Sequence, residues 1–131
     1  METADDKLDV IRRFMAAMEK LDYDRALTLV SDDVQYTNIP LGTVRGPDGI
    51  RSVLEPFFAP TVTNEWLISN TAVNGDTVFL ERTDRHQLAR GWVELPVVGV
   101  FVVREGRIVE WRDYFDFATI QNGFAAVGSQ R

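Results

Sequence analysis

The sequence predicts a single α+β domain in which helices come first and a run of strands follows. In residues 8–21, apolar side chains recur every three or four positions, which is the stripe of an amphipathic helix. After Pro60 the chain changes to short segments rich in β-branched and aromatic residues, which are typical of strands. Glycine turns at residues 74–76 (Asn-Gly-Asp) and 105–107 (Glu-Gly-Arg) separate apolar runs, so they predict hairpins in a largely antiparallel sheet. This order of elements indicates helices packed on one face of the sheet.

The early part of the chain predicts three helices and one strand. The first helix covers residues 8–21. Acidic residues at 22 and 24 offer N-caps for a second helix over residues 25–30. A Gly-Pro-Asp-Gly sequence at 46–49 opens a third helix over residues 50–58, with its proline near the first turn. Residues 34–38 predict an isolated strand between the second and third helices.

The later part predicts four strands, at residues 66–68, 77–80, 97–103 and 108–111. The patterns of the predicted strands at 77–80 and 108–111 continue beyond their apolar runs, to residue 84 and to residue 115 respectively. Gly128 to Arg131 read as a frayed end. The chain has 131 residues, which suits one domain over residues 1–131 with one core.

Composition excludes several classes of function. The 20 acidic and 14 basic residues give a net charge of −6, the wrong sign for a protein that neutralises phosphates, so neither nucleic acid nor a membrane is an expected partner. No apolar run approaches the ~20 residues that a membrane span needs. The absence of cysteine excludes thiol chemistry and thiolate metal sites and gives the reducing cytoplasm as the default location. The single histidine, His86, excludes a metal site with two or more imidazoles, so no metal is expected.

Three predicted strands direct polar side chains toward the core. Side chains two apart on a strand share a face, and three such sets mix apolar and polar residues: Val78, Leu80, Arg82 and Asp84; Val109, Trp111, Asp113 and Phe115; Val34, Tyr36 and Asn38. Buried charges are costly unless they are paired, so Arg82 and the two aspartates should meet. A purely structural ion-pair network would give the same pattern.

The same residues carry a resemblance to a known family. Three segments, residues 36–41 (Tyr-Thr-Asn-Ile-Pro-Leu), 81–84 (Glu-Arg-Thr-Asp) and 99–101 (Gly-Val-Phe) through 111–116 (Trp-Arg-Asp-Tyr-Phe-Asp), resemble the limonene-1,2-epoxide hydrolase family. The likeness extends from the first helix to about residue 117. It implies an NTF2-like (cystatin-like, SnoaL-like) cone, a strongly curved mixed sheet, largely antiparallel, with the N-terminal helices on its concave face. It also implies a homodimer.

The resemblance also implies roles for five residues. The Asp-Arg-Asp set of the family falls on Asp84, Arg82 and Asp113, and its water-holding Tyr and Asn fall on Tyr36 and Asn38. The implied reaction is cofactor-independent hydrolysis of a small apolar epoxide to a vicinal diol by direct attack of water. Asp113 would be the base and Asp84 the acid, because epoxide opening needs one carboxylate in each protonation state.

An apolar pocket should surround these groups and favour an uncharged epoxide. The expected pocket residues are Met15, Met18, Phe57, Trp66, Leu95 and Val97, although each could equally be ordinary core. His86 stands where family members tend to carry an apolar pocket residue, so it bears on the substrate more than on the reaction.

Two other functions remain open from the sequence. The first is an isomerase or cyclase on the same fold, in which one aspartate moves a proton from carbon. Arg82 argues against it, because such a base should be free of a cation. The second is a non-enzymatic module that binds an apolar ligand, since fold does not determine function.

Overall fold

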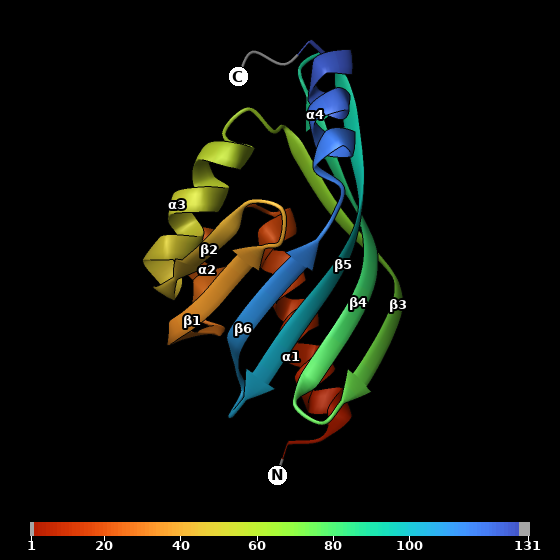
Figure 1. The fold of residues 1–131 in the computed structure, drawn as a ribbon. Coiled ribbons are helices and arrows are strands. Elements are labelled where there is room, and N and C mark those ends of the chain that lie inside the picture. The colour runs from red at the N-terminus through yellow and green to blue at the C-terminus, as the bar shows by residue number, and fades with distance from the viewer. Residues whose placement is uncertain (1, 129–131) are drawn as a thin grey trace.

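The structure is a computed structural model that describes residues 2–128. Most of the predicted frayed end therefore lies outside the described residues. A six-stranded sheet in the order β2-β1-β6-β5-β4-β3 forms one layer, and the helices lie against it (Figure 1). The bounds are α1 (Ala4–Glu19), α2 (Tyr23–Leu27), β1 (Val30–Asn38), β2 (Gly42–Arg45), α3 (Gly46–Phe58), β3 (Thr63–Asn74), β4 (Thr77–Leu88), β5 (Gly91–Arg104), β6 (Arg107–Tyr114) and α4 (Phe117–Ala126).

The predicted α+β class and the two hairpins are confirmed. β3, β4, β5 and β6 are joined in antiparallel register, and two-residue turns lie at 75–76 and 105–106. Glu105 and Gly106 both have positive φ, at 53° and 76°, which is the geometry of a type I′ hairpin turn. The one parallel pair joins β1 to β6 and makes the sheet mixed. The strands curve around α1 in Figure 1.

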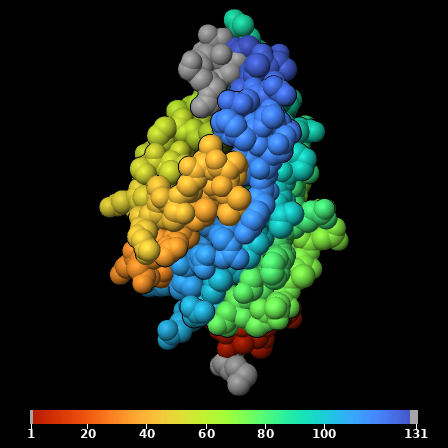
Figure 2. All heavy atoms as spheres, viewed as in Figure 1, coloured from red at the N-terminus to blue at the C-terminus, as the bar shows by residue number. Residues whose placement is uncertain are grey.

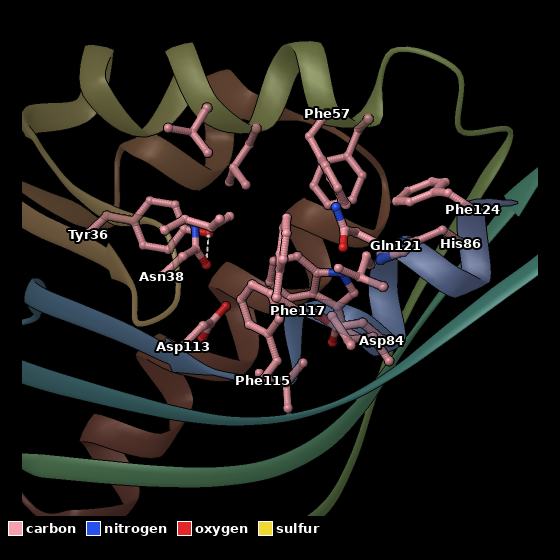
Figure 3. A pocket seen from close by; sticks show the side chains of 18 residues that line it. Tyr36, Asn38, Phe57, Asp84, His86, Asp113, Phe115, Phe117, Gln121 and Phe124 are labelled. Carbon is pink, nitrogen blue, oxygen red and sulfur yellow. Dashed lines mark hydrogen bonds between the residues drawn. The ribbon is translucent and has the colours of Figure 1, made fainter. Parts of the chain in front are cut away.

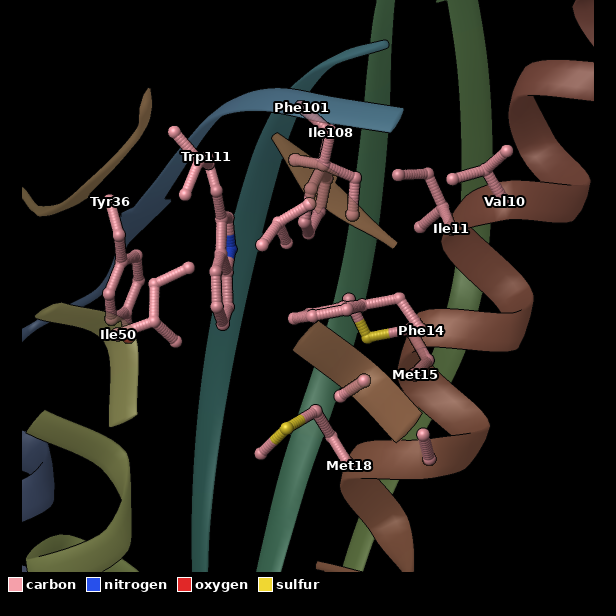
Figure 4. Close-up of a cluster of buried hydrophobic side chains, with 14 of the residues drawn as sticks. Val10, Ile11, Phe14, Met15, Met18, Tyr36, Ile50, Phe101, Ile108 and Trp111 are labelled. Carbon is pink, nitrogen blue, oxygen red and sulfur yellow. The ribbon is translucent and has the colours of Figure 1, made fainter. Parts of the chain in front are cut away.

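The start of the first helix has a clear local cause. Thr3 caps it through a reciprocal pair of hydrogen bonds with Asp6, a capping box. Its apolar stripe packs against the sheet with Phe14 in edge contact with Phe101 and Trp111 (Figure 4). This packing forms the main core.

Several predicted bounds were wrong. The second helix stops at Leu27, and Val30 instead starts β1, where it is buried and pairs with Ile108 of the parallel neighbour. β3 is 12 residues long because β4 supplies hydrogen-bond partners for its polar half, which has no strand pattern of its own. Two elements were not predicted at all, the edge strand β2 and the helix α4. α4 buries Ile120 and Phe124, and Phe117, Ile120, Phe124 and Val127 recur at helical spacing, a pattern that the prediction overlooked.

α3 and α4 create the space for a site. α3 packs beside β1, and α4 packs against the end of β5, where Gly123 lies against Val93. Both helices lie on the face of the sheet that carries the inward side chains, and α4 extends beyond the region covered by α1 (Figure 1). No helix in residues 2–128 has the length and apolar character to cross a bilayer.

Candidate active site

A cavity of about 490 Å³ lies between α3, α4 and the inner face of the sheet (Figure 3). Its lining is mainly aromatic and aliphatic, and its polar groups include Tyr36, Asn38, Asp84, His86 and Asp113. Leu41 and Phe117 line the cavity and are also exposed, so they mark its rim.

One guanidinium binds both aspartates behind the cavity wall. Arg82 donates to Asp84 through Nε (2.7 Å to Oδ1) and Nη2 (3.1 Å to Oδ2). It donates to Asp113 through Nη2 (2.7 Å to Oδ2) and Nη1 (3.1 Å to Oδ1). Only 1% of the Arg82 side chain is exposed, and Cζ of its guanidinium lies over the Trp66 ring, 4.8 Å from the ring centroid. The expected meeting of Arg82 with the two aspartates is therefore present.

Sheet register brings these side chains together. Arg82 and Asp84 both point inward from β4 because they are two residues apart. Asp113 lies two strands away on β6, and Gly99 of β5 is its register partner. A Cβ atom at Gly99 would lie 2.6 Å from Nη1 of Arg82 and 3.2 Å from Oδ1 of Asp113. The missing side chain at Gly99 thus gives the guanidinium room to cross β5.

Parallel pairing places the two expected water-holding residues beside Asp113. Asn38 is the register partner of Asp113, and Tyr36 is the partner of Trp111. The rings of Tyr36 and Trp111 stack with centroids 4.0 Å apart. Tyr36 donates to Oδ1 of Asn38 at 3.1 Å, which leaves the amide nitrogen of Asn38 facing the cavity as a donor.

The two aspartates differ in what stabilises their charge. Burial raises the pKa of both Asp84 and Asp113, and Arg82 opposes that rise in each. Asp113 has one further donor, because Nε1 of Trp111 donates to its Oδ1 at 2.7 Å. A hydrogen bond to the ionised form favours that form, whereas the negative charge of Asp84 acts in the opposite direction and raises the pKa of Asp113.

Arg82 itself stays charged. Burial alone would lower the pKa of Arg82, but the charges and hydrogen bonds of Asp113 and Asp84 together raise it above its ordinary value. The group of three therefore contains one fixed positive charge and two carboxyl groups.

The structure brings most of the predicted pocket residues into the cavity. Phe57, Trp66, His86, Leu95 and Val97 line it. Met15 and Met18 do not, and that prediction was wrong. α1 lies over the main core, where both methionines are at most 3% exposed and pack between the helix and the sheet (Figure 4).

Sequence reasoning missed several groups at the site, among them Val53, Leu54 and Phe58 of α3, which line the cavity. Gly99 and Trp111 belonged to recognised segments, but their contacts with Arg82 and Asp113 depend on pairing across strands. Asn64, which bonds His86, lies on a stretch of β3 that was not predicted as strand. The α4 lining, including Gln121 and Phe124, followed an unpredicted helix. Its available signals were the apolar spacing of Phe117, Ile120 and Phe124 and the residue Asp116, which caps α4 by accepting from the backbone of Thr119.

Comparison with known proteins agrees with these features. The family model described as "Limonene-1,2-epoxide hydrolase catalytic domain" matches residues 5–126. The chain is 33% identical over 106 residues to epoxide hydrolase EphG of Mycobacterium tuberculosis, covering 81% of this chain and 70% of that protein. It also resembles the solved structure of an M. tuberculosis LEH-like epoxide hydrolase, with a TM-score of 0.78 and 30% identity over 94% of this chain and 95% of the other.

A more distant structure shows how widely the fold occurs. A putative SnoaL-like polyketide cyclase from Shewanella putrefaciens superposes with a TM-score of 0.84 at 17% identity, covering 95% of this chain and 99% of that one. At that identity the likeness concerns the fold alone, which is the NTF2/SnoaL-like fold expected from the sequence. Because the family model covers nearly all of the described residues, the chain belongs to the limonene-1,2-epoxide hydrolase family.

Proposed function

We propose that this protein is an epoxide hydrolase that opens an apolar epoxide to a vicinal diol in one step, without a covalent intermediate or a cofactor. The observation that carries the proposal is the pair of buried aspartates bridged by one arginine at the wall of an apolar cavity. Tyr36 and Asn38 lie beside one member of that pair. The membership of the chain in an epoxide hydrolase family supports the same reaction.

The charge count supplies the acid and the base. Two carboxylates close to a single cation leave one negative charge without compensation, so a state with one proton on the pair is favoured. Asp84 holds that proton, and Asp113 carries the charge that Trp111 helps to stabilise. The site thus offers a general acid and a general base at the same pH.

The reaction then balances without further groups. A water held by Tyr36 and Asn38 loses a proton to Asp113 as its oxygen forms a bond to an epoxide carbon. The carbon–oxygen bond of the ring breaks, and Asp84 gives its proton to the departing alkoxide. Transfer of the new proton from Asp113 to Asp84 restores the starting state. The apolar lining excludes bulk water and favours an uncharged substrate.

The isomerase alternative fits the site less well. A base that takes a proton from carbon works best when no cation stabilises its charge. Here Arg82 makes two hydrogen bonds to each carboxylate, and the Tyr36–Asn38 pair would have no role.

We also propose that the protein is a homodimer. On the face of the sheet opposite the helices, Phe79, Val98 and Tyr114 are 38–42% exposed. In the space-filling view, β4, β5 and β6 form the lower right part of the near surface, next to β1, β2, α3 and α4, and α1 is visible only at its lower end (Figure 2). Sedimentation velocity tests this proposal, because Tyr114→Lys should convert a dimer to monomers.

An isotope experiment tests the reaction. A panel of terpene, cycloalkene and fatty-acid epoxides first identifies a substrate by diol formation. Enzyme in excess then converts that substrate in ¹⁸O-labelled water in a single turnover. Direct attack places the label in the first diol and none in the protein. An unlabelled first diol, with label later found in Asp84 or Asp113, would instead show an ester intermediate and contradict the one-step reaction.

A further inference from the structure

A histidine lies at the end of the cavity beyond the acid. His86 follows Asp84 by two residues on β4, so the two side chains share a face about 7 Å apart along the strand. His86 is only 2% exposed, yet it lines the cavity together with Phe57, Gln121 and Phe124 (Figure 3). The one-step reaction described above gives it no task.

The orientation of the Asn64 amide is determined by its other partners. Nε1 of Trp66 can only donate, and it lies 3.1 Å from Oδ1 of Asn64. The carbonyl of Met18 can only accept, and it lies 2.9 Å from Nδ2. Both contacts require the same assignment of the amide oxygen and nitrogen, so Oδ1 of Asn64 is an acceptor.

That acceptor determines where the proton of His86 lies. Nδ1 of His86 is 2.8 Å from Oδ1 of Asn64, and a bond between them exists only if Nδ1 carries the hydrogen. Burial, reinforced by the positive charge of Arg82, lowers the pKa of His86 to about 4, so the ring is neutral near pH 7. A neutral imidazole with its proton on Nδ1 has a lone pair on Nε2.

This lone pair has no protein donor. Nε2 points away from Asn64, and within residues 2–128 no side chain or backbone N–H donates to it. The neighbouring rings of Phe57 and Phe58, with centroids 5.7 and 5.2 Å from the imidazole, have no polar hydrogen to offer. A buried acceptor without a partner is costly, so a ligand that supplies a donor gains affinity here.

We propose that Nε2 of His86 accepts a hydrogen bond from a hydroxyl group of the substrate, and that the preferred substrate is an epoxide carrying a neutral hydroxyl on the arm that extends past Asp84. This specificity rests on the proposed function. The hydroxyl would lie about 7 Å from the acid, measured along β4. A cationic donor is disfavoured because Arg82 lies on the same strand face. The other residues that line this end are Phe57 and Phe124, which are apolar, and Gln121, whose part is tested below.

Three matched probes test the donor requirement. Each is cyclohexene oxide substituted on the ring carbon across from the epoxide, with a hydroxyethyl, a methoxyethyl or a propyl arm. The first arm can donate a hydrogen bond, the second can only accept one, and the third can do neither. We expect kcat/KM for the hydroxyethyl probe to exceed that for the methoxyethyl probe by about tenfold. Equal values for these two probes would overturn the proposal.

Two variants locate the acceptor. His86→Leu should reduce the preference for hydroxyethyl over methoxyethyl to within about twofold. Gln121→Ala removes the other polar side chain at this end of the cavity and should leave the preference intact. If the preference survives His86→Leu, or disappears in Gln121→Ala alone, then Gln121 and not His86 receives the hydroxyl.

A spectroscopic measurement is independent of turnover. The chain has one histidine, so its two ¹⁵N resonances need no assignment by mutation. The wild-type protein near pH 7 should show Nδ1 protonated and Nε2 unprotonated. The diol made from the hydroxyethyl probe should move the Nε2 resonance toward its protonated position, and the diol made from the methoxyethyl probe should not. A proton on Nε2, or equal shifts with both diols, would contradict the proposal. Failure of all three epoxides to react would instead contradict the proposed function.

Discussion

Two polar clusters lie on the inner face of β4, and they differ in charge and in completeness. The first is Arg82 with Asp84 and Asp113, in which every group is ionisable and two carboxyl groups share a single cation. The second is His86 with Asn64 and Trp66, in which every group is neutral at pH 7 and only one lone pair lacks a partner. Arg82, Asp84 and His86 alternate with outward side chains along β4, and the other members come from β3 and β6.

The difference shows how one strand can separate reaction from recognition. A pair of carboxyl groups beside one cation can exchange a proton, because removal or addition of that proton changes the energy of the cluster by a modest amount. A neutral cluster with defined donors and acceptors resists titration and presents a constant hydrogen-bonding pattern. Variants of the first cluster should therefore change rate and stability, whereas variants of the second should change selectivity.

The largest effect should come from neutralising either aspartate. Asp84→Asn and Asp113→Asn each remove one half of the acid–base pair, so diol formation should fall by at least about a hundredfold. Each variant keeps one carboxylate for Arg82 and should remain folded. The rate of diol formation and the circular dichroism spectrum check both expectations. A variant that retains more than about a tenth of the wild-type kcat, a difference of ~1.4 kcal/mol, does not have the role proposed for its residue.

Removal of the shared cation should destabilise the protein. Arg82→Met leaves two buried carboxyl groups without a cation, which should lower the free energy of unfolding by about 3–5 kcal/mol at pH 7. Arg85→Met is the matched control on the same strand. Arg85 pairs with Glu65 and Glu94 near the surface, and its loss should cost no more than about 1 kcal/mol.

The same variant should depend on pH in a defined direction. Burial raises the pKa of Asp84 and Asp113, and in the absence of Arg82 only the hydrogen bond from Trp111 to Asp113 opposes that rise. A carboxyl group with a higher pKa in the folded state favours folding at low pH, and this contribution is lost as pH rises through the raised pKa. Urea unfolding of Arg82→Met should therefore show a smaller deficit at pH 4 than at pH 7. An equal deficit at both pH values would contradict the explanation by charge.

A smaller effect is expected at the glycine beneath the guanidinium. The added Cβ of Gly99→Ala would lie 2.6 Å from Nη1 of Arg82, so the bridge must shift. We expect a loss of about 1–3 kcal/mol in unfolding free energy, as for other overpacked sites, together with a fall in kcat. Val62→Ala, at an exposed position outside the cavity lining, should change neither by a comparable amount. Wild-type values for Gly99→Ala in thermal unfolding and in kcat would show that the bridge does not need this space.

The smallest effect concerns the pH profile of His86. Because burial holds the pKa of His86 at about 4, the residue should not titrate between pH 5 and 9. The decline of kcat/KM at high pH should come from loss of the shared proton on the aspartate pair and should occur at the same pH in His86→Leu. Profiles of both proteins on the propyl probe measure this. A step near pH 6.5 in the wild type that is absent from His86→Leu would place His86 in the proton transfer.

Much of the fold was predictable because its information is local. The spacing of Ile11, Phe14 and Met18 predicted α1, and the Glu-Gly turn at 105–106 predicted the β5–β6 hairpin. Alternation along β4 was enough to place Arg82 and Asp84 on the inner face. These patterns have periods of a few residues, and the physical preferences that they express act within one helix or strand.

Other features depended on tertiary structure because their partners are distant in sequence. Val30 became a strand residue only because Ile108 lies beside it, and α4 is held by Val93 on β5. Met15 and Met18 have the composition of pocket residues, but the position of α1 over the sheet places them in the core. The sequence by itself determined which polar side chains face inward. The sheet register determined that they meet, because only pairing across strands brings Asp113 to Arg82 and Asn64 to His86.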